Sequence, residues 1–545
     1  VDGAEVSADG GETWVTSLRE WVERGAQVTV KVRAPDGAHI YLMDPEGVLS
    51  DDGTTATLTI TSAQPNVIKA GATVTWQNGS DKASNYWDDE TQWKDEYGVN
   101  RLPAACDNVV IPNQSAYPYS GSTIIVTNTT PRFKKVWIGR GRFVSMRNWM
   151  TQFRAGEVIL NGDSARAATI TCGSGYATGA MSNRVWIVAD RLALSNSYAS
   201  VSASGYAKKH GPGWEGIASP SGGGAHGGKA YSGNCQTYGS ITEPTAPGTG
   251  TWSDNNDGHG GGAIRIEVGE LLVNGSISTP AGKNLYGGGN GSGGSVWITC
   301  ETISGTGTVS ANGGGSENAT LCGSNGGGGG RISVNYNPEK QALVDCQVSF
   351  SARGGLERSS TSYARYNTCG NCGTLYFTDD IFLRRPTMKL AGIVYYGPDV
   401  TPVSSFTGES RTLENTWLVI TNDNAEVNFT GDLTLKGTSA KMNGVQLTGR
   451  HTTVNIGGNL SCSGAQLRVD GGDSVSIAGN VVLEDGASAV NSGELNFRAA
   501  PTNENDVAAR PLTIGGDFVL GYLEMLPRRV GPFSESGIIL VGESF

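Results

Sequence analysis

The chain has 545 residues, of which 80 are glycine and only 17% are charged, and its formal net charge is −11. The glycine share is about twice the usual value, yet no three-residue period accompanies it, which excludes collagen. Because no long basic or acidic run occurs, we expect neither nucleic acid nor an anionic membrane surface as the main partner. No apolar stretch of about 18 residues predicts a membrane span.

The sequence favours a protein of the extracellular space or the cell surface. It begins at Val1 rather than Met, and we interpret it as a secreted protein whose signal peptide has been removed; a fragment of a longer chain is the alternative. Nine cysteines are an odd number, so an oxidising compartment would leave at least one outside the intramolecular disulfides. For the CxxC pair Cys369 and Cys372 we predict a structural disulfide, with a metal or redox role as the alternative.

Residues 1–75 are predicted to form a small, separate, β-sandwich-like domain. The runs 27–32 and 57–60 alternate polar and apolar residues with the period of two of half-buried strands, and residues 12–24 include the only short helical candidate. The segment from Ser7 to Trp14 resembles the Asp-box, the SxDxGxTW hairpin of sialidases and other secreted β-proteins. We favour a role in stabilising the hairpin turn over any catalytic role.

Residues 76–130 are predicted to be a segment that caps the first coil of a repetitive stack. Trp76, Trp87 and Trp93 lie in it, ahead of the run 107–112. This arrangement resembles the start of many secreted bacterial β-helix proteins, in which tryptophans cover the exposed first coil. An uncovered end would present unpaired backbone groups and apolar side chains, so we favour capping over sugar binding.

Two kinds of repeat fill the rest of the chain, in segments 131–410 and 411–545. In the first, strands that begin at Val185, Ile264 and Val296 each lead through a turn to a second strand and then to glycines. In the second, four copies of one pattern place a short polar residue after a glycine at the same corner: Asp432, Asn459, Asn480 and Asp517. We expect these side chains to form a hydrogen-bonded ladder on successive coils.

The repeats predict an all-β fold. Short strands without helices between them exclude a Rossmann sheet and a TIM barrel, and we predict a right-handed parallel β-helix, a solenoid, after the N-terminal domain. An array of β-sandwiches is the alternative. The central section, about residues 180–380, resembles the glycine-rich, pectin-lyase-like β-helix proteins that environmental bacteria export. The resemblance rests on five motifs, at residues 260–266, 293–298, 326–332, 351–355 and 373–377.

The resemblance indicates the fold more strongly than the function. Relatives of this type include adhesins and surface-layer proteins, whereas the wider superfamily includes polysaccharide lyases and glycosidases. If adjacent coils bring His226 and His259 together, an acid/base cluster is completed by three neighbours: Lys229, Asp257 and Glu215. We favour the competing interpretation that the surrounding glycines let backbones approach closely where long loops leave and re-enter the stack.

The insertion 207–260 contains further candidate contacts for a glycan or a protein partner, which are the aromatic residues Trp214, Tyr231, Tyr238 and Trp252. A small core under a long loop is an equally good explanation of these residues. The spacing of three oxygen-bearing residues is similar to that of a calcium loop, although the bidentate glutamate of an EF-hand is missing: Asp254, Asn256 and Asp257. Calcium is thus the one cofactor considered, and it is not favoured.

Paired carboxylates are scarce, and the pair Asp379–Asp380 is predicted to lie in a solvated turn. We therefore expect a non-enzymatic extracellular protein, such as a subunit of a surface filament, a matrix protein or an adhesin. It would self-associate through residues 1–75 or the segment after Pro511. One alternative is a polysaccharide lyase or glycoside hydrolase that acts on an acidic glycan, which would need clustered basic residues; the candidates are Lys208, Lys209, Lys229 and Arg265. A non-catalytic glycan-binding protein is the third hypothesis.

Overall fold

The computed structural model describes residues 5–15, 27–34, 40–44, 48–50, 54–61, 67–77, 85–105, 107–114, 123–173, 182–214, 222–230, 235–251, 258–282, 289–315, 326–355, 369–401, 405–437, 444–484, 494–499, 512–520 and 537–541. They belong to two compact units. The first comprises Val1–Cys172, Val185–Tyr198 and Glu267–Gly275, and the second comprises Gly173–Arg184, Ala199–Ile266 and Ser276–Phe545. Nearly every element is a strand, and most pairs are parallel, so the all-β prediction is confirmed.

The first unit begins with antiparallel strands, which are β1 (Glu5–Ser7), β2 (Gln27–Arg33), β3 (Ile40–Asp44), β4 (Val48–Leu49), β5 (Thr55–Thr61) and β6 (Val67–Ala70). They form a sheet in the order β1-β2-β5-β4 and a separate β3–β6 pair. Alternate residues of β2 and β5 are buried together with Val6, as the period of two predicts: Val30, Val32, Ala56 and Leu58. Most of the helical candidate, residues 16–24, lies outside the described residues.

The Asp-box-like segment forms a tight hairpin turn. Asp9 accepts hydrogen bonds from the Ser7 hydroxyl at 2.5 Å and from the Thr13 amide at 2.9 Å, and Val6 and Val15 exchange backbone bonds. The side-chain bond from Ser7 is the largest cause that lowers the pKa of Asp9, so the carboxylate stays ionised as an acceptor. These contacts are those expected of a motif that stabilises a turn.

Parallel pairing follows in the first unit, through β7 (Thr73–Trp76), β8 (Trp93–Asp95, after the 3-10 turn Glu90–Gln92), β9 (Asn108–Ile111), β10 (Thr123–Val126), β11 (Phe133–Gly139), β12 (Phe143–Met146), β13 (Phe153–Asn161), β14 (Thr169–Cys172) and β15 (Val185–Ser200). One series runs β7–β9–β11–β13–β15 and another β10–β12–β14, whereas β7 and β8 are antiparallel. Val109, Val136, Val158 and Leu192 are successive partners in the first series, and all are buried.

The three tryptophans of the capping segment are packed together rather than exposed. The ring of Trp93 lies 4.9 Å from that of Trp76 and 4.6 Å from that of Trp87, and Trp87 also contacts Phe133 and Phe153. None of the three is more than 7% exposed. Since a sugar-binding tryptophan needs an open face, the contacts support capping.

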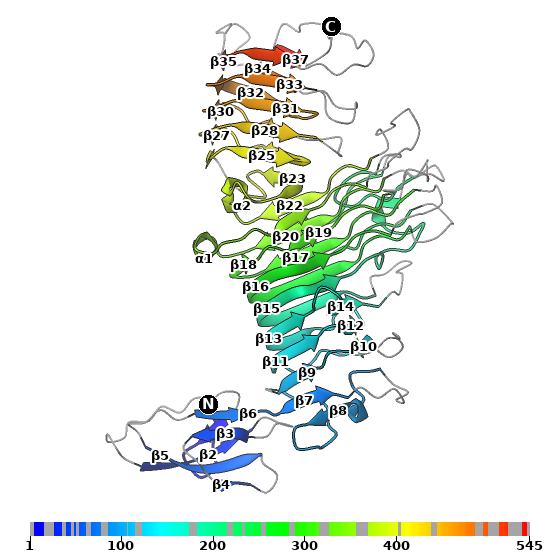
Figure 1. Ribbon diagram of the computed structural model, residues 1–545, viewed down its shortest axis with the longest axis vertical. Helices are drawn as coiled ribbons and strands as arrows, with labels where there is room; N and C mark the ends of the chain where they lie inside the picture. The colour runs from blue at the N-terminus through cyan, green and yellow to red at the C-terminus, as the bar shows by residue number, and fades with distance from the viewer. Residues whose placement is uncertain are drawn as a thin grey trace. The chain divides into compact units, whose positions relative to one another are not determined.

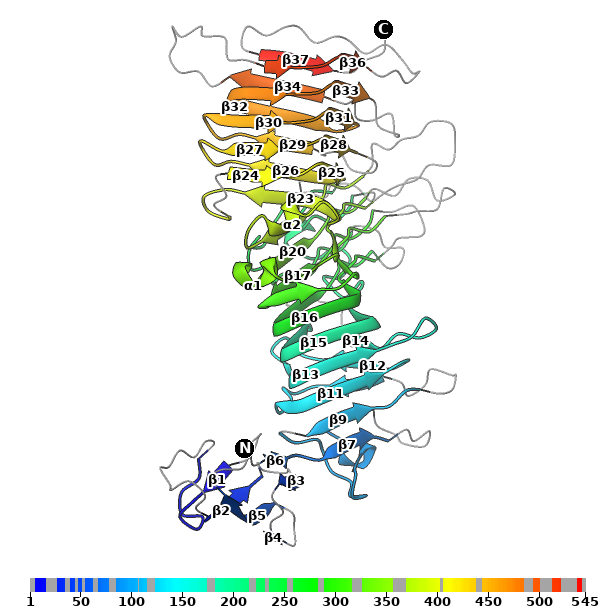
Figure 2. The ribbon, with the colours of Figure 1, turned by 60° about the vertical axis from the view of Figure 1, so that its left-hand side comes forward.

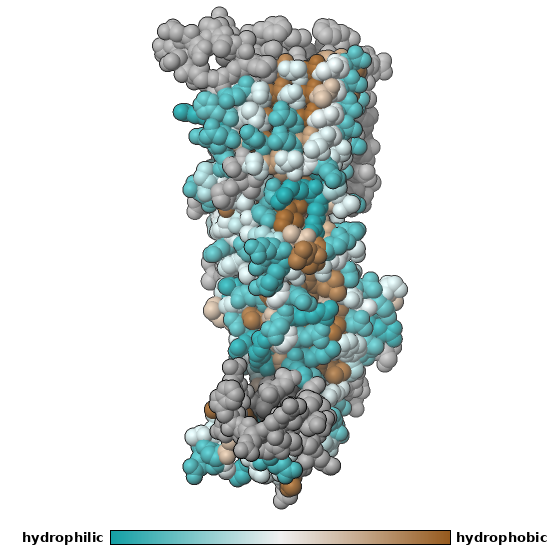
Figure 3. Space-filling view, turned by 90° about the vertical axis from the view of Figure 1, so that its left-hand side faces the viewer, coloured by the Kyte–Doolittle hydropathy of each residue, from teal (hydrophilic) through white to brown (hydrophobic). Residues whose placement is uncertain are grey.

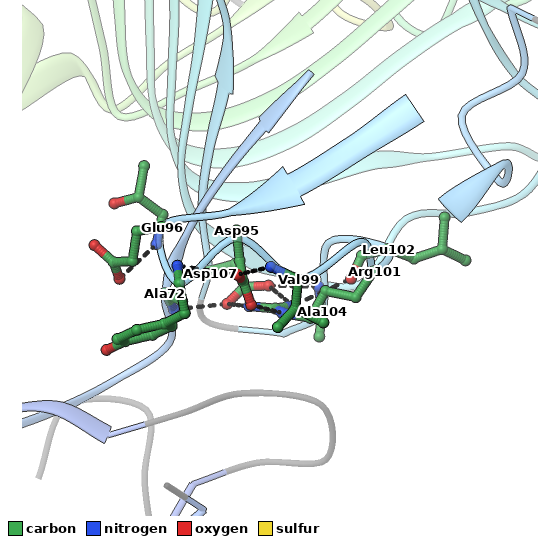
Figure 4. A network of polar contacts seen from close by, with 10 residues as sticks. Ala72, Asp95, Glu96, Val99, Arg101, Leu102, Ala104 and Asp107 are labelled. Carbon is green, nitrogen blue, oxygen red and sulfur yellow. Dashed lines mark hydrogen bonds and ion pairs between the residues drawn. The ribbon is translucent and has the colours of Figure 1, made fainter. Parts of the chain in front are cut away.

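A buried ion-pair network fixes the loop between β8 and β9 (Figure 4). The guanidinium of Arg101 bonds Asp107 at 2.7 Å and Asp95 at 3.2 Å, and both carboxylates are almost fully buried. Asp107 also accepts from the amides of Ala72 and Ala104, each at 2.8 Å. Because each buried charge has several partners, the desolvation cost of the network is offset, and the loop is held in one conformation.

The chain continues with β16 (Ala263–Ser278), whose residues 267–275 belong to the first unit and whose two ends belong to the second. The second unit then contains β17 (Ser295–Thr299), β18 (Thr302–Ser304), β19 (Thr308–Ser310), β20 (Arg331–Asn335), β21 (Ser349–Ser351), β22 (Thr374–Phe377) and β23 (Leu390–Tyr396). Its helical turns are Pro212–Trp214, α1 (Pro338–Ala342) and α2 (Ile381–Arg384). Parallel pairing joins β17, β20, β22 and β23 in one series and β16, β19, β21 and β23 in another. Every other element in the described part of this unit is a strand.

Three series of strands share the last part of this unit, which contains β24 (Ser405–Gly408), β25 (Arg411–Glu414), β26 (Thr416–Ile420), β27 (Glu426–Phe429), β28 (Leu433–Lys436), β29 (Gly444–Leu447), β30 (Thr452–Ile456), β31 (Leu460–Ser463), β32 (Gln466–Ile477), β33 (Val481–Glu484), β34 (Glu494–Ala499), β35 (Leu512–Ile514), β36 (Phe518–Leu520) and β37 (Gly537–Val541). They are β23–β26–β29–β32–β34, β24–β27–β30–β32–β35 and β25–β28–β31–β33–β36. The chain visits the three series in turn, as the stacked strands of Figures 1 and 2 show, and β37 pairs antiparallel with β34.

The predicted polar ladder is confirmed at the corner that precedes the third series. The side chain of Asp432 accepts from the Asn459 amide at 2.7 Å, that of Asn459 from the Asn480 amide at 2.8 Å, and that of Asn480 from the Asp517 amide at 2.8 Å. Glycine precedes each polar residue because a Cβ on Gly458 would lie 2.3 Å from the Asp432 side-chain oxygen. The ladder thus requires both residues of the Gly–Asn or Gly–Asp step.

The ladder makes a prediction about stability. Replacement of Asn459 by Ala leaves the Asn480 amide without its acceptor, and we expect the free energy of unfolding to fall by about 1–2 kcal/mol. The matched control is Asn455→Ala, which removes only an exposed side-chain bond to Asn428. Denaturant unfolding followed by circular dichroism compares the two variants. Equal losses would contradict a special role for the corner.

Candidate functional site

The glycine-rich segments, which contain the candidate acid/base residues His226 and His259, are largely buried. Between the strands of the second unit they run extended without regular strand pairing, at 222–230, 246–251, 258–262, 279–282, 289–294, 311–314, 326–330, 352–355 and 369–373. We call this set the glycine block. Its described segments leave the ends of the green strands in Figure 1.

Hydrogen bonds in the glycine block repeat every three residues. In 326–330, the amides of Gly328, Gly329 and Gly330 donate to Gly224, Asn371 and Ala311, which belong to three different segments. The amide of Gly327 returns to the same segment as that of Gly330, because it donates to Gly314. Three residues per turn with no bonds inside the segment is the geometry of a polyproline II helix, and segment 326–330 has this pattern. Segment 369–373 has it too, because Gly370 and Gly373 both donate to 352–355 and Asn371 donates to Lys229.

Close packing of backbones explains why glycine is needed. A Cβ on Gly294 would lie 1.9 Å from the carbonyl oxygen of Gly262, one on Gly330 would lie 2.0 Å from that of Gly294, and one on Gly373 would lie 1.8 Å from that of Gly330. No side chain fits at such distances. The interpretation that the glycines allow close backbone approach is therefore confirmed.

His226 is enclosed in the glycine block. Its Nδ1 lies 2.8 Å from the carbonyl oxygen of Gly293, its ring stacks 4.6 Å from that of Tyr238, and the side chain has no exposed surface. Burial, helped by the nearby positive charge of Arg331, lowers the pKa of His226 to about 3. Because the His226 side chain has no exposed surface, it is not placed to contact a substrate.

The other members of the predicted acid/base cluster do not complete a site around it. His259 is buried, and its carbonyl oxygen accepts the Gly282 amide at 2.9 Å. Lys229 is exposed at the surface. Asp257 and Glu215 lie outside the described residues. The glycine block therefore provides no open cluster of these groups within the part of the chain that is described.

The aromatic residues of the insertion hold it against the strands. Trp214 packs on a small core of Ala225 and Cys235. The Tyr238 hydroxyl donates to Pro247 at 2.6 Å, and its carbonyl oxygen accepts Arg331 at 2.8 Å. These contacts support the alternative of a core under a long loop; Tyr231 and Trp252 lie outside the described residues.

Neither of the metal or disulfide predictions gains support. The calcium candidates Asp254, Asn256 and Asp257 lie outside the described residues, and the described residues include no group of three metal-ligating side chains.

The predicted Cys369–Cys372 disulfide is wrong, because Cys372 is a buried thiol that points to the Asn415 carbonyl. In an extended threefold segment, residues three apart are about 9 Å apart, which exceeds the reach of a disulfide. Burial raises the pKa of the Cys372 thiol to about 11.

An open site lies elsewhere in the second unit, between α1 and α2. This cleft has a volume of about 800 Å³ and is lined by Glu339, Asp379, Ile381, Arg384, Arg385 and Glu409, among others. Figure 3 looks at the side of the molecule that carries both helices, where hydrophilic residues border smaller apolar areas. The residue pattern did not predict it, since α1 and α2 are single turns whose positions depend on tertiary contacts.

Buried polar contacts fix the two walls of the cleft. On α1, the fully buried Gln341 side chain bonds both the amide and the carbonyl of Ile303, at 2.7 and 3.0 Å. Before α2, Asp379 accepts from the Tyr336 hydroxyl and from the Ile381 amide. Arg385 joins the walls by donating to the Gln341 carbonyl at 3.0 Å.

Asp379 and Asp380 correct the prediction of a solvated turn. Asp380 is only 8% exposed and pairs with Arg384 at 2.7 Å. Burial raises the pKa of Asp380, although the positive charge of Arg384 acts in the opposite direction. The two adjacent carboxylates serve different side chains, because Asp379 accepts from Tyr336 and Asp380 pairs with Arg384.

Comparisons of the chain with models of known families, with curated protein sequences and with solved structures find no match. Among the described residues, no helix is long and apolar enough to cross a membrane. Function must therefore be argued from the geometry of the chain itself.

The burial of His226 predicts acid sensitivity. Its pKa in the folded protein, about 3, lies below the ordinary value of 6.5, so the unfolded state binds the proton more readily. The stability that this group contributes is complete above pH 6.5 and is lost as the pH falls toward 3. Between pH 7 and pH 4 we expect it to account for a loss of about 3 kcal/mol.

Denaturant unfolding at a series of pH values tests this expectation. His226→Gln should lower stability at pH 7 but flatten the decline toward pH 4. His451→Gln is the matched control, because the side chain of His451 is exposed, and it should leave the decline in place. Parallel curves for the wild type and His226→Gln would show that His226 does not cause acid sensitivity.

The close packing of the glycine block predicts a large effect of one methyl group. Gly330→Ala should destabilise the protein by several kcal/mol or prevent folding, since the carbonyl of Gly294 must move. Gly239→Ala is the control, because Gly239 has φ +80° but no atom closer than 3.6 Å to a Cβ. It should cost about 1–2 kcal/mol. Thermal unfolding of both variants measures the difference, and a smaller effect at Gly330 would contradict the packing argument.

Proposed function

We propose that the chain is a non-catalytic structural protein of the extracellular space, and that its parallel strands are successive coils of a right-handed β-helix. The support for coils is that the chain visits three parallel series in the same order each time, from β23 to β36. In such a chain, main-chain hydrogen bonds in all three series join each rung to the next. That arrangement suits a mechanical spacer or a filament subunit.

A single observation carries the proposal: the glycine block, which contains the candidate base His226, is packed backbone on backbone. The base of the lyase alternative would be His226, which has no exposed surface. Of the basic residues that a lyase would need, Arg265 stacks on the ring of Trp297 at 4.2 Å. These contacts favour a structural role over catalysis.

An extracellular location agrees with the state of the cysteines as well as with the composition. Burial raises the pKa of Cys172 and of Cys300 to about 12 in each case, and that of Cys372 to about 11. A thiol that is buried and protonated reacts slowly with oxidants. Such cysteines tolerate an oxidising compartment without forming disulfides.

Incubation with acidic polysaccharides tests the absence of catalysis. We expect no release of unsaturated or reducing ends from polygalacturonate, alginate or heparin. Cleavage that persists in His226→Gln would identify another catalytic group, and cleavage abolished by this substitution in a folded protein would restore the lyase hypothesis.

Negative-stain electron microscopy of protein purified without denaturant tests the structural role. We expect filaments with a regular repeat, formed through residues 1–75 or the segment after Pro511. Single particles of uniform size at all concentrations would contradict the filament form of the proposal.

A further inference from the structure

The cleft between α1 and α2 has the properties of a ligand site that the structural role does not explain. Its volume of about 800 Å³ lies in the range of small-molecule sites. Its walls are fixed by buried contacts of Gln341, Tyr336 and Asp379, so it exists before a ligand binds. A preformed site avoids the entropic cost of ordering on binding.

We propose that this cleft binds a short stretch of a neutral, hydroxyl-rich polysaccharide. The lining offers hydrogen-bond acceptors at Glu339, Asp379 and Glu409, and donors at Arg384 and Arg385. A sugar hydroxyl both donates and accepts, so neighbouring hydroxyls of one ring can bond a carboxylate and a guanidinium together.

The apolar part of the lining supports the same ligand. Pro338, Ala342, Ile381 and Pro386 give the cleft carbon surface beside its charges. The C–H face of a pyranose ring fits such a surface, whereas a purely ionic ligand would leave it unused. None of the described lining residues is aromatic, so we expect modest affinity.

The charge balance selects a neutral glycan over an acidic one. Three carboxylates face two guanidiniums in the lining, and Arg384 is already paired with Asp380. A uronate carboxylate would meet net negative charge, which disfavours its binding. Arg385 is likewise engaged, because it donates to the Gln341 carbonyl at 3.0 Å.

The test uses the full chain and four defined trisaccharides: cellotriose, maltotriose, chitotriose and trigalacturonate. Saturation-transfer NMR identifies binding, and titration gives the dissociation constant. We expect at least one neutral trisaccharide to bind and trigalacturonate to bind more weakly than that sugar. Glu409→Gln and Glu339→Gln should each weaken binding by about tenfold, because each removes a charged hydrogen-bond acceptor.

Both glutamates are exposed, so neither substitution should alter the melting temperature. The matched control is Glu484→Gln, an exposed glutamate at the end of β33 outside the cleft, and it should leave affinity within twofold. The proposal is overturned if no neutral trisaccharide binds, if both cleft variants bind like the control, or if trigalacturonate binds best. None of these outcomes affects the cleavage and filament tests, so the cleft and the structural role stand or fall separately.

Discussion

The close contact of main chain with main chain is the constraint on which the second unit depends. In the parallel series it takes the form of ladder hydrogen bonds, with buried Val, Ile and Leu beneath them. In the glycine block it takes a second form, in which extended helices bond three neighbours each and leave no room for a Cβ. Both forms satisfy backbone donors and acceptors without side chains. A chain with 80 glycines can therefore remain compact although it has comparatively few large apolar residues.

This constraint also decides which parts of the chain can present a side chain to a ligand. A segment in the glycine block contributes its backbone to three neighbours, so a reactive side chain such as His226 is enclosed rather than presented. A small-molecule site is therefore expected where the regular pattern is interrupted. The turns α1 and α2 are such interruptions, and the cleft lies between them. Polar side chains fix its walls, among them Gln341 and Asp379.

The residue pattern predicts the repeating features well because they depend on local geometry. The alternation of polar and apolar residues in β2 and β5 predicts which side chains are buried. The Gly–Asn pair at Asn459 likewise predicts the corner in which it lies. The features that it misses depend on contacts distant in sequence. Asp380 is buried only because α2 packs where it does, and His226 is enclosed by segments that lie far ahead in the chain. The CxxC of Cys369 and Cys372 misleads for a related reason, since its spacing suits a turn but not an extended threefold helix.

The side-chain ladder at Asp432, Asn459, Asn480 and Asp517 has a direction. Each side-chain oxygen accepts the amide of the following rung, and the first acceptor is the Ser410 hydroxyl, which receives the Asp432 amide at 3.0 Å. Asp517 is the last rung of this ladder among the described residues. The stack is therefore a polar template, in which each rung fixes the register of the rung that follows it and not of the rung before it.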